Sequence, residues 1–209
     1  MANKYLKRKI RNYEIYKTML ISILMCLSFF TGEYVYSKKF FGDIIVNIIV
    51  GLVLGIIGAI LTIIFENYMI SQARYRKGLE LESQVEDKLK RLRIKYEPHL
   101  EDGHGDLDFL LSGNNNFYGI EVKNQSGLIR FENNNLMISN FKNTYILKNL
   151  LKHCKLIRDI KFGDSSDRFI KPILIFGYKA VVDIPQNKIK FNNVEIIVAT
   201  INDFERYII

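Results

Sequence analysis

Cysteine and proline are both scarce in this sequence: its 209 residues include two cysteines and three prolines. Cys26 lies in an apolar run and Cys154 far from it in a mixed stretch, so no disulfide framework is expected and a reducing compartment fits. The cysteines and histidines do not have the spacing of a zinc site. With few prolines and almost no low-complexity sequence, a long disordered segment is not indicated.

Charged residues are missing from one long stretch. Residues 44–65 read IIVNIIVGLVLGIIGAILTIIF, with Asn47 and Thr62 as the polar breaks. A helix of about 22 residues spans the hydrocarbon core of a bilayer. A domain of this size cannot surround such a helix on all sides, which disfavours a buried core helix. The stretch therefore predicts a transmembrane helix.

A shorter apolar run precedes this segment. It covers residues 18–31 and reaches about residue 36 only by including Glu33. A secretory signal peptide is the alternative, but the preceding stretch is long and no small-residue cleavage site follows. We therefore expect a helical hairpin with spans at about 18–36 and 44–65.

Basic residues flank the two apolar runs on their outer sides. They are Lys4, Lys7, Arg8, Lys9, Arg11 and Lys17 before the first run, and Arg74, Arg76 and Lys77 after the second. The connecting turn is nearly neutral. The positive-inside rule then predicts a multi-pass protein of the inner (plasma) membrane with both termini in the cytosol. These flanks also suit anionic lipids, which accounts for much of the net charge of +8 without any nucleic acid.

Gly51 and Gly55 place two small residues four apart in the second span. Such a face allows a second helix to pack closely and suggests a homo-oligomer. Glycine is also common in membrane helices that make no such contact, so both interpretations stay open.

From residue 78 onward the sequence has the pattern of a mixed α/β domain. Residues 78–93 repeat apolar side chains at helical spacing, and strands at 107–111 and 117–123 read as a β-hairpin. Other strands are expected at 94–100 (broken by Pro98), 128–131, 136–139, 172–177, 180–183, 188–191 and 194–199, and other helices at 141–157 and 202–207. This order predicts two domains: a basic N-terminus and membrane hairpin over 1–77, and an α/β domain around one sheet over 78–209.

Acidic and basic side chains meet at one end of the hairpin. Asp108 begins the first strand, whereas Glu121 and Lys123 end the second on a shared face, with Val122 pointing into the core between them. Two carboxylates with water and phosphate oxygens suit Mg²⁺. A metal held there polarises a phosphoryl oxygen and lowers the pKa of a bound water, which Lys123 can position or deprotonate.

An Asp, a hairpin and then Glu-x-Lys resemble the signature of the PD-(D/E)xK nuclease superfamily. Within it, the sequence resembles the nuclease-related domain (NERD) family over roughly residues 78–177. The matching residues are Gly78 and 82–85 in the helix, 107–108 and 120–124 in the strands, and 127–129 in the following turn. The resemblance implies a restriction-endonuclease-like mixed sheet flanked by helices, with an αβββαβ core.

The resemblance also implies a set of site residues. Glu82, Asp108, Glu121 and Lys123 would be catalytic, and Asp108, Glu121 and the backbone carbonyl of Val122 would bind Mg²⁺ or Mn²⁺. Glu82 would be a helper carboxylate that orders the metal or Lys123.

Several neighbouring residues compete with this set or depart from the family. Glu80 and Glu86 compete with Glu82, Asp106 fits the turn equally well, and His104, His99 and His153 are weaker candidates. Leu81 stands where the family usually has a second Gly, and Phe109 where it often has His. The later helix lacks the family's Gln, for which Gln125 is a substitute candidate.

The sequence thus predicts a membrane-anchored, metal-dependent (endo)nuclease. DNA is favoured over RNA as substrate, and DNA processing or defence against foreign DNA is the role that the resemblance implies. One alternative is a non-catalytic module that binds nucleic acid or a partner at the inner membrane face. Another is a membrane scaffold that oligomerises through Gly51 and Gly55. Metal-dependent cleavage distinguishes the first from the other two.

Overall fold

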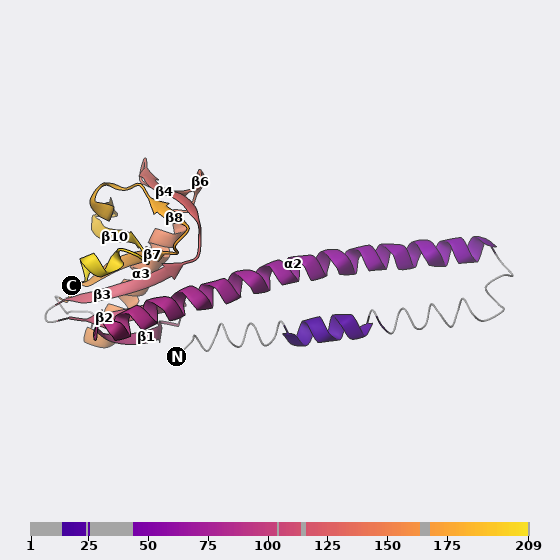
Figure 1. Ribbon diagram of the computed structural model, residues 1–209, viewed down its shortest axis with the longest axis horizontal. Coiled ribbons are helices and arrows are strands. Elements are labelled where there is room, and N and C mark those ends of the chain that lie inside the picture. The colour runs from indigo at the N-terminus through magenta and orange to yellow at the C-terminus, as the bar shows by residue number, and fades with distance from the viewer. Residues whose placement is uncertain are drawn as a thin grey trace. The chain divides into compact units, whose positions relative to one another are not determined.

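A computed structural model of the chain describes residues 14–23, 25, 44–103, 105–113, 116–163 and 168–208 (Figure 1). The described residues fall into two compact units that divide between Arg76 and Lys77. The predicted span at 18–36 lies outside the described residues except for 18–23 and 25, which are helical.

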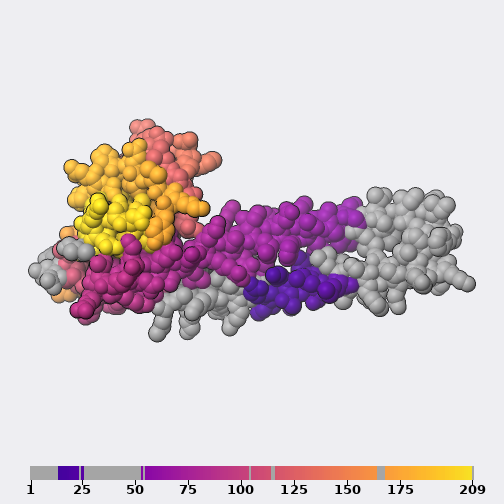
Figure 2. Space-filling model, viewed as in Figure 1, coloured from indigo at the N-terminus to yellow at the C-terminus, as the bar shows by residue number. Residues whose placement is uncertain are grey.

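The first unit consists of the helical residues 14–23 and most of a long helix, α2 (Ile44–Arg91). The two lie alongside each other (Figure 2), where Glu14 accepts hydrogen bonds from Gln72 at 2.5 Å and Arg76 at 2.7 Å. Among the described residues, one helix is long and apolar enough to cross a membrane. It is the Gly55–Arg91 part of α2.

α2 is a single helix of 48 residues. The sequence had suggested an apolar span that ends near residue 65 and a separate helix from residue 78. The linking residues 66–77 contain neither glycine nor proline, so nothing in them ends the helix. Its side chains differ along its length, because Ile56 and Ile60 are exposed whereas Val85 and Leu89 are fully buried.

The second unit is built on a mixed six-stranded sheet with the order β1-β2-β3-β7-β10-β9. Its strands are β1 (Lys95–Glu101), β2 (Asp106–Ser112), β3 (Phe117–Lys123), β7 (Ile170–Phe176), β10 (Val194–Thr200) and β9 (Lys188–Phe191). β3, β7 and β10 are parallel, and the outer strands are antiparallel. Pro98 does not break its strand, because β1 is at the sheet edge, where a missing N–H leaves no ladder bond unmade.

A second, four-stranded sheet corrects the expectation of a single sheet. It has the order β6-β5-β4-β8, with β6 (Phe141–Lys142), β5 (Asn135–Ile138), β4 (Gly127–Glu132) and β8 (Ala180–Val182). The backbone N–H of Asn143 donates to the carbonyl of Leu136 at 2.8 Å, which keeps the chain extended past β6. Helix α3 (Tyr145–Phe162) therefore begins later than the predicted residue 141. Two short 3₁₀ helices, η2 (Pro185–Asn187) and η3 (Phe204–Tyr207), complete the unit.

The mixed α/β class is confirmed, and α2, β1–β3, α3 and β7 follow the expected αβββαβ order, with β4–β6 between β3 and α3. The six-stranded sheet is buried on both faces. α2 packs on one face through Leu81, Val85 and Leu89. α3 packs on the other and approaches β3 so closely that a Cβ on Gly119 would lie 2.5 Å from the sulfur of Cys154. Glycine at this position is what permits the contact.

Candidate functional site

Side chains along a strand normally alternate between the two faces of the sheet. In β1 and β2 this alternation is interrupted at positions that lie opposite each other. Leu107 belongs to the core on the α3 side, yet Phe109, two residues later, belongs to the core on the α2 side. In β1, His99 has a φ of 51°, a left-handed conformation that histidine adopts more readily than most residues. The flanking residues keep a continuous register, so His99 and Asp108 lie opposite each other at this distortion.

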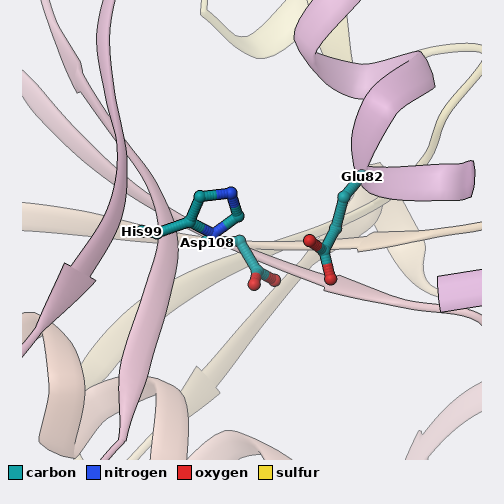
Figure 3. Close-up of side chains that lie close together, drawn as sticks. All are labelled: Glu82, His99 and Asp108. Carbon is teal, nitrogen blue, oxygen red and sulfur yellow. The ribbon is translucent and has the colours of Figure 1, made fainter. Parts of the chain in front are cut away.

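Three side chains from three elements meet here. Glu82 of α2, His99 of β1 and Asp108 of β2 each offer one ligand atom, and these atoms lie within 4.8 Å of one another. Figure 3 shows the imidazole of His99 and the carboxylate of Glu82 on opposite sides of the Asp108 carboxylate. Asp108 is 6% exposed, so this cluster lies at a buried position at the edge of the sheet core.

β3 contributes a second charged group next to this cluster. The ammonium of Lys123 donates to Oε1 of Glu121, and these side chains are 30% and 13% exposed. Val122, between them, is buried in the core on the α2 side. Its backbone N–H donates to Oδ2 of Asp108 at 2.6 Å, which joins β2 to β3 where their regular pairing ends.

The carboxylates strongly perturb one another. Burial raises the pKa of Glu82 to about 7, and the charges of Asp106 and Glu121 add to the rise while Lys123 opposes it. Burial also raises the pKa of Asp108 well above its usual value, with further contributions from Glu121 and Glu82. Lys123 and the Val122 N–H act in the opposite direction. Burial and the neighbouring carboxylates together thus outweigh the effect of the single ammonium on both pKa values.

The unpaired oxygens show what the cluster is suited to bind. Oε2 of Glu82 and Oε2 of Glu121 are buried, and neither has a hydrogen-bond partner in the part of the chain that the structure describes. Hard carboxylate oxygens with one imidazole nitrogen form a donor set that suits a divalent cation. These residues therefore fit a divalent metal ion.

The arrangement differs from the predicted ligand set in two ways. Glu121 is not among the three side chains whose ligand atoms come together, and its Oε1 accepts a hydrogen bond from Lys123. His99 is among them, although the sequence offered it only as a weak candidate. A signal was present: the turn at 101–105 makes strand 94–100 antiparallel to strand 107–111, which brings His99 near Asp108.

The other candidates lie around the cluster. Asp106 is close enough to raise the pKa of Glu82. Glu86 accepts a hydrogen bond from Tyr96 at 2.9 Å, and His153 contacts Asp102 at 2.5 Å. Glu80 and Gln125 line a separate pocket, and His104 lies outside the described residues.

The segment that holds this cluster also has a counterpart among protein families. Residues 77–177 match the model of the nuclease-related domain (NERD). The matched NERD segment runs from the part of α2 that carries Glu82 to the residue after β7, and so contains Glu82, His99, Asp108, Glu121 and Lys123. Searches of curated proteins and of solved structures gave no significant match.

Proposed function

We propose that this chain is a membrane-anchored, metal-dependent nuclease of the NERD family, with Glu82, Asp108, Glu121 and Lys123 as its catalytic residues. One observation carries the proposal. A buried carboxylate cluster with unsatisfied oxygens lies beside a lysine, within a segment that matches a nuclease-related domain. Carboxylates and a lysine around a metal are suited to hydrolysis of a phosphodiester bond.

The proposed metal site combines the ligands expected from the sequence with two more. Asp108 and Glu121, with the Val122 carbonyl, are the ligands expected from the family. The proximity of Glu82 and His99 to Asp108 supports adding both. Mg²⁺ or Mn²⁺ bound here supplies positive charge to a phosphoryl oxygen and lowers the pKa of a bound water.

Lys123 acts as a fixed positive charge in this proposal. Burial lowers its pKa, but the neighbouring charges of Glu121 and Asp108 outweigh that effect, and the pKa is raised overall. The side chain therefore stays protonated at neutral pH and serves better as a donor than as a base. Held by Glu121, its ammonium is placed to stabilise the charge that develops on the phosphate during attack.

The anchor and the substrate complete the proposal. The apolar residues 44–65 of α2 cross the inner (plasma) membrane, as the second arm of a hairpin within residues 1–77. Residues 78–209 then lie in the cytosol, and Gly51 and Gly55 offer a face for a second copy. Family resemblance favours DNA over RNA, cut internally, in DNA processing or defence.

Cleavage by the full-length protein in detergent tests the proposal. Plasmid, single-stranded DNA and RNA are incubated with Mg²⁺, Mn²⁺ or EDTA. Wild type should cut DNA with metal and not with EDTA, and Asp108→Asn should cut more slowly at limiting metal. Lys190→Gln, a change at an exposed residue of edge strand β9, should leave it intact. Binding of DNA without cleavage under every metal condition would instead support the non-catalytic module.

A further inference from the structure

A pocket of about 440 Å³ lies beside the candidate site. Its lining is Lys77, Glu80, Leu81, Gln84, Asn124, Gln125, Ser126, Gly177, Tyr178 and Lys179. Lys123 and Phe176 are paired at the ends of the parallel strands β3 and β7, and the pocket is formed by the residues that follow them together with four residues of α2. This is the place where open α/β sheets usually bind their ligands.

Besides the carboxylate of Glu80, the lining has three kinds of group that suit a nucleotide. Gln84, Asn124 and Gln125 bring side-chain amides, each of which offers donors and an acceptor. Lys77, Lys179 and Tyr178 are exposed, so two cations and one aromatic ring are accessible to a ligand. Oε1 of Gln125 is buried and has no hydrogen-bond partner within the described ranges. A turn of the Gln125 side chain toward the pocket would let a ligand there supply the missing partner.

We propose that this pocket binds one unpaired nucleobase of the substrate strand, next to the phosphate that is cut. The position of that phosphate rests on the nuclease function proposed above. A glutamine or asparagine amide can bond two atoms on the edge of one base, and lysines beside it can neutralise the adjoining phosphates. A cavity of 440 Å³ has the size of a small-ligand site and accommodates a single nucleotide.

The pocket is close enough to the candidate site for neighbouring nucleotides of one strand to occupy both. Gln125 follows Lys123 by two residues, which spans at most roughly 7 Å of chain. A base held by Gln125 then belongs to a nucleotide adjoining the phosphate at Lys123. Because a base paired in a duplex must first be extruded, the pocket favours single-stranded, flapped or frayed DNA.

Removing bases one at a time from the ligand tests this binding mode. The full-length protein in detergent is titrated, in EDTA, with fluorescent single-stranded oligonucleotides that each carry one abasic position. For wild type, we expect one position at which base loss weakens binding roughly fivefold or more, as for loss of one bidentate contact. Gln125→Ala should weaken binding of the intact oligonucleotide by a similar factor. This variant should then bind the oligonucleotide with that abasic position as tightly as the intact one.

Matched variants separate base recognition from charge and from folding. Asn202→Ala and Lys190→Gln, at exposed residues outside the pocket, should leave the abasic profile unchanged. Lys179→Gln should weaken all oligonucleotides about equally and reduce the dependence on salt. Gln125→Glu, which keeps the side chain's size, should match Gln125→Ala in the profile if both retain the wild-type melting temperature.

The outcomes for the pocket and for the nuclease function are distinct. If wild type cleaves DNA but its abasic profile is flat, or if Gln125→Ala leaves a peaked profile unchanged, the pocket does not hold a base and the nuclease function stands. If wild type cleaves nothing, the nuclease function fails. A peaked profile that Gln125→Ala flattens would then still establish a base-binding pocket.

Discussion

Two charged groups lie close together in this protein and differ in how their charges are balanced. Glu121 has its own cation, because Lys123 donates directly to it. Glu82 and Asp108 have none among the described residues that binds them directly, and burial and mutual repulsion raise both their pKa values. The difference suggests that the two groups have different roles. In the proposed function, Lys123 would act on the phosphate, whereas the Glu82–His99–Asp108 group would hold an added cation.

The largest expected effect comes from removing the internal cation. Lys123→Ala should reduce the single-turnover cleavage rate roughly a hundredfold or more at saturating metal, because its charge acts mainly on the transition state. DNA affinity should change far less, since Lys123 makes one phosphate contact among many. Lys190→Gln is the control for loss of a positive charge. Cleavage by Lys123→Ala at the wild-type rate would exclude the role proposed for this residue.

The next effect concerns the group without a cation. Asp108→Asn should weaken binding of Mg²⁺ or Mn²⁺ at least roughly tenfold by calorimetry, more than loss of a supporting contact would. The amide oxygen can still accept the hydrogen bond from the Val122 N–H, so the fold should persist. Glu121→Gln should have a smaller effect, because Lys123 already pairs with that side chain. Equal metal affinity in wild type and Asp108→Asn would remove Asp108 from the metal site.

A subtler change tests the participation of His99. His99→Asn keeps a residue that tolerates the left-handed backbone and replaces imidazole nitrogen with an amide oxygen. Imidazole suits transition metals, so the ratio of Mn²⁺ to Mg²⁺ affinity should fall by roughly tenfold. His153→Asn, on the neighbouring Asp102 contact, is the control. An unchanged ratio would show that His99 does not bind the metal.

The smallest effect is on stability without metal. The pKa of Glu82 is raised to about 7 and that of Asp108 is raised, so the folded state holds more protons than the unfolded state above pH 4.5. Stability should then fall as the pH rises from 5 to 8. We expect the melting temperature in EDTA to fall by a few degrees over this range, at about 2–4 °C per kcal/mol. Asp108→Asn or added Mn²⁺ should reduce the slope, and a steeper slope with Mn²⁺ would contradict this account.

The sequence predicted those features of the two charged groups that depend on the local pattern of residues. Glu121 and Lys123 share a face because β3 alternates regularly, and the hairpin with β2 follows from its short turn. The proximity of His99 to Glu82 and Asp108 was not predicted, because the break in alternation at His99 and Asp108 depends on packing from both sides of the sheet. The second sheet was missed for a related reason, since β4 pairs with β8, which lies about fifty residues away in the chain.

The length of α2 was also not predicted from the local sequence pattern. Its two halves have different apolar patterns, which suggested two helices, but no glycine or proline separates them over residues 66–77. Helix continuation depends on the absence of a stop signal more than on a constant amphipathic face.

The tight contact between Gly119 and Cys154 makes that cysteine a natural reporter. Its sulfur is buried against β3, and burial raises the pKa of the thiol, so thiolate is scarce in the folded protein. Maleimides and alkylating agents should therefore modify Cys154 slowly in the folded protein and much faster when α3 separates from the sheet. In a Cys26→Ser background, the rate of alkylation would measure how often this core opens. Cysteines introduced elsewhere could then be labelled to map membrane topology without interference from the native thiol.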